Sequence, residues 1–254
     1  MSVGYACADR VAVVTIERPE CRNAVDPATA ALLVKAFERF SADTDADVAI
    51  LTGSGGTFCA GYDLRAVVTS DLNGLLSDAD YAPMGPSRMV LPKPVIAAVE
   101  GYAVAGGLEL ALWCDLRVAA SDAVFGVFSR RFGVPLVDLG TIRLPRLLGH
   151  SVAMDLILTG RAVSAIEAKQ IGLVNRIAPT GNALSAAREL AYQIAAFPQT
   201  GLRNDRLSAI EQWGLDEKTA IENELRHGRM TNASGEGKGG AARFSRGEGR
   251  HGNF

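Results

Sequence analysis

The chain has 254 residues, of which 48% are hydrophobic and 21% charged, a composition typical of a globular enzyme. The formal net charge of -2 provides no excess of positive charge for nucleic acid, and the three histidines leave little for a metal site. No stretch approaches the ~20 consecutive apolar residues that a membrane-spanning helix requires. The composition therefore predicts no nucleic-acid partner, no membrane partner and no metal.

The first half of the chain alternates between predicted strands and helices. Asp26 before Pro27 is a typical helix N-cap with proline in the first turn, and apolar residues at helical spacing extend that helix to about Ser41. A short apolar helix is predicted at 108–114. The stretch 66–89 lacks periodicity and is predicted to be a mobile loop or a short irregular helix. Short apolar, β-branched runs predict strands at 10–18, 48–52, 94–104, 116–120 and 123–127.

After Gly140 the pattern becomes helical. Ser164 and Glu167 form a capping box ahead of 168–171. The end of the chain, 235–254, is rich in glycine and arginine and is predicted to be loosely ordered. Strand–helix alternation followed by helices predicts an α/β core at 1–195 and a C-terminal helical region with a Gly/Arg-rich tail at 196–254. Amphipathic helices are predicted in this second half at 183–197, 200–213 and 216–230.

Two glycine-containing turns are candidates for a binding site. The first, 57–64, follows a strand, and the second, 100–109, joins a strand to a helix. Glycine lets a backbone approach a ligand closely, and the amides at a helix N-terminus favour negative charge. Either turn alone is more often structural. The dinucleotide fingerprint is excluded because Phe58 stands where its third glycine belongs, and neither a P-loop nor a G-x-S-x-G motif occurs.

Taken together, these turns resemble a known family. The run F-C-A-G-Y-D-L from Phe58 is followed by P-V-I-A-A-V-E-G-Y-A-V-A-G-G-L-E-L-A from Pro94 and by C-D-L-R-V-A from Cys114. With the later segments G-R-A-V-S-A and I-G-L-V-N, the series resembles the enoyl-CoA hydratase/isomerase (crotonase) family from Val11 to about Ala178. The resemblance implies an α/β, crotonase-like spiral of ββα units. It also implies a C-terminal helical oligomerisation region that forms trimers, often paired into hexamers.

The same resemblance implies where the substrate binds. An oxyanion hole would be formed by the backbone amides of Tyr62 and Gly106, which hold the thioester oxygen of an acyl-CoA as negative charge develops on it. The CoA would lie near Arg22, Ala24 and the backbone of Ala60. Arg22 either forms a charge-assisted bond with a phosphate or is an exposed loop arginine without a ligand.

Hydratases of this family use two glutamates, and the sequence retains one. Glu109 matches the first and lies in the first turn of a short helix, where the dipole favours its ionised, basic form; a helix-capping role is the alternative. Ser129 stands where the second belongs, and a hydroxyl cannot replace a carboxylate in acid–base chemistry near neutral pH. Asp138 resembles, with a one-residue slip, the proton-transfer aspartate of the family's dienoyl-CoA isomerases. Alternatively, Asp138 caps the helix that begins near Thr141.

Other charged residues near these positions also have alternative roles. Arg130 and Arg131 either line the acyl pocket beside Ser129 and favour an anionic acyl group, or they face solvent or a subunit interface. Asp63 and Asp115 resemble the family's structural aspartates, which cap nearby amides.

Three hypotheses of function follow. The first is an enoyl-CoA hydratase or isomerase of fatty-acid metabolism that uses Glu109 and Asp138 for proton transfer. The second is another reaction of the family, such as decarboxylation, thioester hydrolysis or C–C cleavage, and it is motivated by the arginine pair and the missing glutamate. The third is a catalytically silent acyl-CoA-binding protein.

All three hypotheses share the same partners. Each takes an acyl-CoA, needs no cofactor beyond that CoA, and predicts a homotrimer or hexamer. The N-terminus lacks the basic start and apolar core of a secretory signal, and the four cysteines include no C-x-x-C pair. Free thiols and no signal predict a cytoplasmic location.

Overall fold

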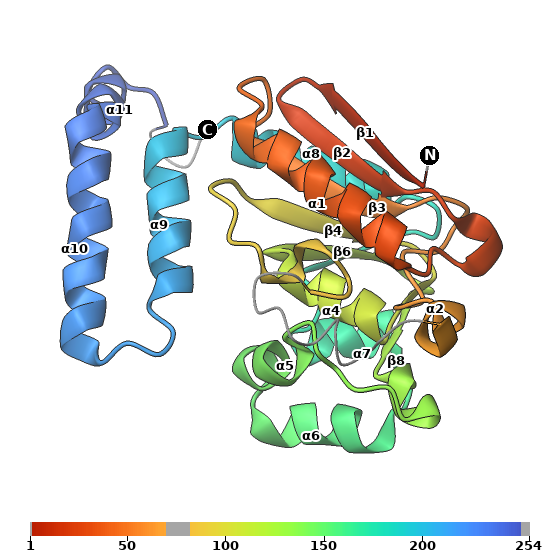
Figure 1. The fold of residues 1–254 in the computed structure, drawn as a ribbon. Helices are drawn as coiled ribbons and strands as arrows, with labels where there is room; N and C mark the ends of the chain where they lie inside the picture. Colours follow the sequence, from red (N-terminus) through yellow and green to blue (C-terminus); the bar gives the residue numbers. More distant parts are fainter. Residues whose placement is uncertain (1, 70–81, 250–254) are drawn as a thin grey trace. The chain divides into compact units, whose positions relative to one another are not determined.

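The computed structural model describes residues 2–69 and 82–249 and divides the chain into two units, Met1–Gln193 and Ile194–Phe254 (Figure 1). The first unit is built on a six-stranded sheet in which β1 is antiparallel to β2 and all other neighbours are parallel. In sheet order, its strands are β1 (Val3–Ala8), β2 (Val11–Ile16), β3 (Val48–Gly53), β4 (Val95–Val99), β6 (Leu116–Ala120) and β9 (Arg176–Ala178).

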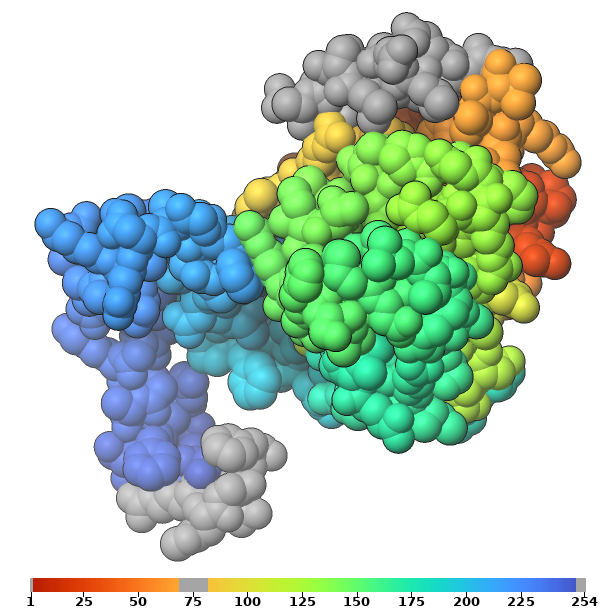
Figure 2. All heavy atoms as spheres, turned by 90° about the horizontal axis from the view of Figure 1, so that it is seen from below, coloured from red at the N-terminus to blue at the C-terminus, as the bar shows by residue number. Residues whose placement is uncertain are grey.

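A smaller sheet, seven described α-helices and three described 3-10 helices complete this unit. The smaller sheet has the order β5 (Tyr102–Val104), β7 (Val124–Gly126) and β8 (Val163–Ser164). Short 3-10 helices occupy Pro19–Cys21, Pro86–Arg88 and Phe128–Phe132. The α-helices are α1 (Pro27–Ala42), α2 (Leu64–Thr69), α4 (Gly106–Trp113), α5 (Gly140–Leu148), α6 (His150–Thr159), α7 (Ala165–Gln170) and α8 (Ala183–Ala195). Helices α5 and α6 follow one another along the face seen in Figure 2, where they are green.

From β4 to β7, successive strands alternate between the two sheets, which agrees with the predicted α/β fold of ββα units. The chain leaves β4 in the large sheet, turns at Gly101 (φ 55°) and enters β5 in the small sheet before α4 begins. β6 and β7 repeat this step. The single strand predicted at 94–104 is therefore wrong, because the left-handed turn at Gly101 breaks it in two. Isolated bridges from Val25 to Tyr62 and from Cys59 to Ala103 extend the small sheet beside β5.

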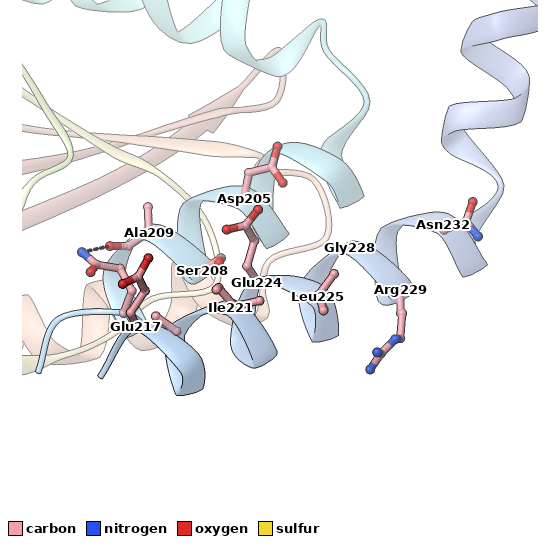
Figure 3. A pocket seen from close by; sticks show the side chains of 12 residues that line it. Asp205, Ser208, Ala209, Glu217, Ile221, Glu224, Leu225, Gly228, Arg229 and Asn232 are labelled. Atoms are coloured by element: carbon pink, nitrogen blue, oxygen red, sulfur yellow. Dashed lines mark hydrogen bonds between the residues drawn. The ribbon is translucent and has the colours of Figure 1, made fainter. Parts of the chain in front are cut away.

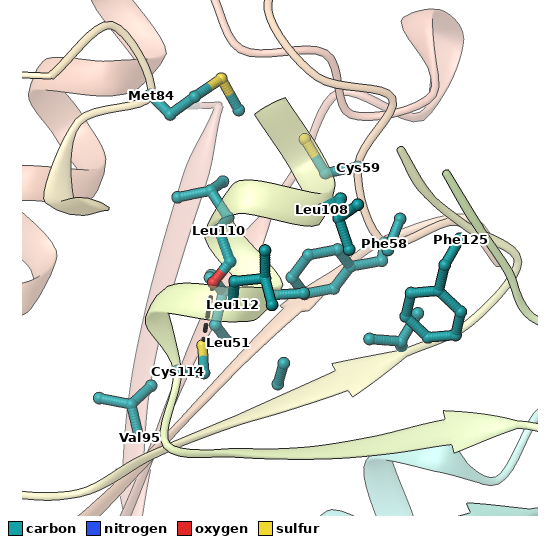
Figure 4. Packing of buried hydrophobic residues seen from close by; sticks show 14 of the residues in the cluster. Leu51, Phe58, Cys59, Met84, Val95, Leu108, Leu110, Leu112, Cys114 and Phe125 are labelled. Atoms are coloured by element: carbon teal, nitrogen blue, oxygen red, sulfur yellow. Dashed lines mark hydrogen bonds between the residues drawn. The ribbon is translucent and has the colours of Figure 1, made fainter. Parts of the chain in front are cut away.

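The core of the first unit holds the start of α4 in place. All five residues of β4 are buried, as expected for a parallel strand covered on both faces. Leu108 and Leu110 of α4 lie in the same buried cluster as Phe58 and Phe125 (Figure 4). Burying a side chain of this size is worth about 1.5–3 kcal/mol, so this packing fixes the helix whose first turn carries Glu109.

The second unit contains three described helices, α9 (Gln199–Glu211), α10 (Glu217–Ser234) and α11 (Glu236–Ser245). α9 and α10 form a hairpin that is joined by a buried histidine. The Nε2 atom of His227 lies 2.8 Å from Oε2 of Glu211, and its Nδ1 atom lies 3.2 Å from Oδ1 of Asn204. No helix within the described residues is long and apolar enough to cross a membrane.

Two predictions from composition require comment. Loose order at 235–254 is wrong for Glu236–Ser245, which is helical. The Glu236 carboxylate accepts the amides of Thr200 (3.0 Å) and Gly201 (2.9 Å), so the start of α11 is tied to the start of α9. The predicted mobile loop at 66–89 falls partly on 70–81, outside the described residues, and α2 and the 3-10 helix Pro86–Arg88 occupy its two ends.

Candidate active site

The structure brings the two glycine-containing turns together. Gly61 has a φ of 101°, which L side chains rarely adopt. A Cβ atom at Gly61 would lie 3.0 Å from the amide nitrogen of Gly106 and 2.9 Å from Cβ of Ala105. The backbone before Tyr62 therefore lies directly against the N-terminus of α4, and only glycine permits this approach.

The amide of Gly106 begins α4. The residue before it, Ala105, has φ 53° and ψ -127° and provides no side-chain cap. The first amides of a helix have no intrahelical acceptor, and the helix dipole favours negative charge beside them. Gly106 thus has the local geometry of an anion-binding donor, next to the Tyr62 backbone.

A cavity of about 270 Å³ opens beside these turns. Two of its described lining residues are acidic, Glu109 and Asp138, and each is 2% exposed. Within the described part of the chain, no lysine or arginine lines this cavity. The remaining lining residues are aromatic, aliphatic, proline or glycine: Tyr62, Val67, Pro83, Phe132, Gly133, Val134, Pro135 and Val137.

The carboxyl group of Glu109 is held by the backbone that leads into α5. Its Oε1 atom accepts the amides of Asp138 (2.9 Å) and Gly140 (2.8 Å). Both amides point to one oxygen because Leu139, between them, is left-handed with φ 69°. A Cβ at Gly140 would lie 2.7 Å from Oε1, so any larger residue there would displace the Glu109 carboxyl. Among the described residues, none donates to Oε2 of Glu109, which is therefore available to a substrate.

The protonation state of Glu109 differs from the sequence expectation. Burial and, to a smaller extent, the negative charge of Asp138 raise the pKa of its carboxyl to about 8, while the two amides and Arg143 act to lower it. The prediction that the α4 dipole favours the ionised form is wrong, because a helix dipole is worth at most about 2 kcal/mol and burial outweighs it. Glu109 is therefore mainly protonated at neutral pH.

Asp138 is held by a different set of donors. Its Oδ1 atom accepts the amide of Met84 (3.0 Å) and the hydroxyl of Ser87 (2.6 Å). Burial raises the pKa of the Asp138 carboxyl, while Ser87, Met84 and the nearby Arg88 and Arg143 act to lower it. The alternative role as a helix cap is wrong, since α5 has Leu139 at its N-cap and no side-chain cap bond.

Residues 129–131 are not among the described residues that line the cavity. Ser129 is buried in the 3-10 helix Phe128–Phe132, and its hydroxyl has no hydrogen-bond partner among the described residues. The Nε atom of Arg130 donates to the carbonyl of Ile157 (3.1 Å). Arg131 lies over the ring of Phe128 at 4.0 Å. None of these contacts supports the interpretation that Ser129, Arg130 and Arg131 line the pocket.

Two of the residues expected near CoA, Arg22 and Ala60, are joined by a backbone hydrogen bond. The carbonyl of Arg22 accepts the amide of Ala60 (3.0 Å), and the Arg22 guanidinium lies 5.6 Å from the centre of the Tyr102 ring. The carbonyl of Ala24 accepts a hydrogen bond from Arg18. A phosphate near Arg22 would therefore also lie near the backbone of Ala60.

The two aspartates expected to be structural do bond to backbone amides. Oδ1 of Asp63 accepts the amide of Arg65 at the start of α2 (3.0 Å), and its Oδ2 accepts from Arg18 (3.1 Å). Oδ2 of Asp115 accepts the amide of Val95 (2.8 Å). Both interactions confirm the capping role.

Sequence reasoning missed the residues that hold the two carboxyl groups, namely Met84, Ser87, Leu139, Gly140 and Arg143. Of these residues, only Gly140 could have been noticed in the sequence, as a glycine just before a predicted helix. No group of three or more His, Cys, Asp and Glu side chains within the described residues is arranged to bind a metal.

Comparison with known proteins is consistent with this geometry. A family model described as enoyl-CoA hydratase/isomerase matches residues 7–248. Enoyl-CoA hydratase EchA19 of Mycobacterium tuberculosis is 36% identical over 237 residues, which are 92% of this chain and 89% of that protein. The (E)-benzylidenesuccinyl-CoA hydratase of Thauera aromatica is 37% identical over 212 residues, 83% of this chain and 82% of that protein.

Solved structures agree. The crystal structure of enoyl-CoA hydratase EchA1 from Mycobacterium marinum matches with a TM-score of 0.90 and 37% identity, over 96% of each chain. That of an enoyl-CoA hydratase from Bacillus anthracis matches with a TM-score of 0.88 and 29% identity, over 97% of this chain and 96% of the other. The chain therefore belongs to the enoyl-CoA hydratase/isomerase (crotonase) family of enzymes.

Proposed function

We propose that this enzyme hydrates a trans-2-enoyl-CoA, or moves the double bond of an enoyl-CoA, in fatty-acid metabolism, with Asp138 as the base and Glu109 as the acid. The observation that carries the proposal is the pair of buried carboxyl groups at one cavity, each with a single oxygen available to a substrate. Burial raises the pKa of both carboxyl groups, and we infer that Asp138, whose hydrogen-bond donors act against this, is the one that ionises and serves as the base.

Hydration then needs only proton transfers. Asp138 takes a proton from water as the water oxygen bonds to the β-carbon, and the displaced electron pair moves to the thioester oxygen. We infer that the backbone amides of Tyr62 and Gly106 stabilise that oxygen, and one such donor is typically worth about 3–4 kcal/mol. Glu109 then gives its proton to the α-carbon. The proposed chemistry calls for no cofactor beyond the CoA of the substrate.

Double-bond migration uses the same groups. Asp138 removes a proton from one carbon of the acyl chain, the enolate charge rests on the same oxygen, and Glu109 returns a proton two carbons away. Ser129 takes no part in either reaction, so the proposal does not need the second glutamate that this serine replaces.

The charge of the cavity supports a neutral acyl group as substrate. Its described polar groups are two carboxyl groups and a tyrosine, and Arg130 is bonded to a backbone carbonyl elsewhere. The arginine pair was one motive for another reaction of the family, beside the missing glutamate, and neither arginine is among the described residues that line the cavity. An uncompensated carboxylate placed beside Asp138 would be repelled.

The test is an assay with crotonyl-CoA and a longer trans-2-enoyl-CoA, which follows loss of the conjugated thioester absorbance. A 3-enoyl-CoA is tested for the gain of that absorbance. Turnover is expected with the wild type and not with Glu109→Gln or Asp138→Asn. Retention of turnover in either variant would remove that residue from the mechanism, and turnover of carboxylated acyl-CoAs alone would contradict the proposal.

We also propose that the enzyme is a cytoplasmic homotrimer or a hexamer of two trimers. A groove between α9 and α10 exposes Ile221 and Leu225, each 51% exposed, beside acidic residues (Figure 3). Exposed apolar side chains gathered in a groove are typical of an interaction surface. Sedimentation equilibrium tests this, and a monomer at micromolar concentration would contradict it.

A further inference from the structure

A hydrogen-bonded network holds Asp138, and its other members are not among the described residues that line the cavity. Ser87 is fully buried in the 3-10 helix Pro86–Arg88, and its hydroxyl donates to Oδ1 of Asp138 over 2.6 Å. The amide of Met84 donates to the same oxygen over 3.0 Å. Within the described residues, no donor reaches Oδ2. The two donors therefore fix which oxygen of Asp138 is available to a substrate.

Arg143 holds the two halves of this network together. From α5, its Nη2 atom donates to the carbonyl of Ser87 (2.7 Å) and its Nη1 atom to the carbonyl of Asp138 (3.2 Å). The serine and the aspartate are 51 positions apart in the chain, so neither segment alone sets their distance. The charged groups that face Asp138 are Glu109 from α4, Arg143 from α5 and Arg88 from the same 3-10 helix as Ser87.

We propose that Ser87 is a positioning residue, which by its hydrogen bond to Oδ1 keeps Asp138 a carboxylate with Oδ2 directed at the cavity. The inference rests on the proposed role of Asp138 as the base. A donor to a carboxylate favours the charged form, and Ser87 acts to lower the pKa of Asp138 against the burial that raises it. Met84 cannot substitute for it, because its amide is already bound to the same oxygen.

The experiment measures kcat/KM against pH for the wild type, Ser87→Ala and Ser87→Cys, with crotonyl-CoA or whichever enoyl-CoA the wild type turns over. Asp138 must be ionised and Glu109 protonated, so the profile is bell-shaped. Ser87→Ala is expected to move the acid limb upward by about one to two pH units, the usual effect of a hydrogen bond to a charged group. Ser87→Cys, a weaker donor, should move it less.

The matched control is Ser41→Ala, which removes another serine hydroxyl that is bonded to a backbone carbonyl within α1, 3.0 Å from the carbonyl oxygen of Phe37. Its acid limb is expected to coincide with that of the wild type. A role of Ser87 in folding alone would lower the amount of active enzyme at every pH and leave the limb in place. If Ser87→Ala does not fold, as judged by circular dichroism, Ser87→Cys provides the same comparison.

Asp138→Asn separates this inference from the proposed function. If Asp138→Asn abolishes turnover and the Ser87 variants leave the acid limb unmoved, the positioning role is wrong and the base assignment stands. If Asp138→Asn retains turnover, the base assignment itself is wrong and the inference is overturned with it. An upward shift in the order Ser, Cys, Ala, together with loss of turnover in Asp138→Asn, supports both.

Discussion

Replacing Glu109 by glutamine removes a buried ionisation and preserves the shape of the side chain. The amide oxygen of glutamine can still accept the backbone amides of Asp138 (2.9 Å) and Gly140 (2.8 Å). What changes is the response to pH, because the wild-type carboxyl has a pKa raised by burial from 4.5 to about 8. The folded protein therefore holds this proton over a pH range in which the unfolded chain has lost it.

The sign and the size follow from proton linkage. A carboxyl whose pKa is raised on folding contributes stability that is fully present below its unfolded pKa of 4.5 and is lost as the pH rises through about 8. At 1.36 kcal/mol per pH unit the whole effect is about 5 kcal/mol, of which about 4 kcal/mol falls between pH 5 and pH 9. Glu109→Gln lacks this dependence on pH. Between pH 5 and pH 9, the free energy of unfolding of the variant is therefore expected to rise by about 4 kcal/mol relative to that of the wild type.

The assay is urea unfolding of both proteins at pH 5 and pH 9, at one fixed protein concentration so that any oligomerisation contributes equally. Groups that titrate identically in the two proteins cancel in the double difference. A difference in the free energy of unfolding that is the same at pH 5 and pH 9 would refute the reasoning. It would mean that Glu109 is ionised in the folded enzyme and cannot be the acid.

Three further predictions concern the backbone and the arginine near the site. Gly61→Ala would place a Cβ 3.0 Å from the amide nitrogen of Gly106, so kcat for enoyl-CoA turnover is expected to fall about 10²–10³-fold with circular dichroism unchanged. Gly140→Ala would place a Cβ 2.7 Å from Oε1 of Glu109 and displace that carboxyl. The alkaline limb of the pH profile of kcat/KM is therefore expected to shift, and an unchanged limb would contradict this contact. Arg130→Met is expected to cost at most about 1 kcal/mol in thermal unfolding and to leave KM for a neutral enoyl-CoA unaltered, whereas a large rise in KM would place Arg130 at the substrate.

Elements that depend on local chemistry were predictable. The strand predicted at 116–120 is β6, and the helix predicted after Asp26 is α1, because β-branched runs and an N-cap with proline act over a few residues. Prediction erred where one residue changes the chain direction. The turn at Gly101 splits one predicted strand into β4 and β5. A glycine within an apolar run is compatible with both an extended and a left-handed backbone, so the sequence does not reveal which of the two it adopts.

In the candidate site, too, local features were predictable and features that depend on distant segments were not. Glu109 was identified from the motif around it, since its place in the first turn of a helix is a local property. Its protonation state was predicted with the wrong sign, because burial is decided by segments distant in the sequence. The interpretation of Asp138 as a helix cap was excluded only by the left-handed backbone at Leu139, which directs the start of α5 toward Glu109 instead.

The sequence by itself determined the family, the two turns that carry Tyr62 and Gly106, and one carboxyl group of the site. Only the tertiary structure decided that Asp138 lines the same cavity as Glu109, that Ser87 holds it from 51 positions away, and that Arg130 lines no part of the described cavity. The physical reason is that hydrogen bonds and desolvation depend on distances in space. Packing between sheets and helices sets those distances, and sequence spacing does not.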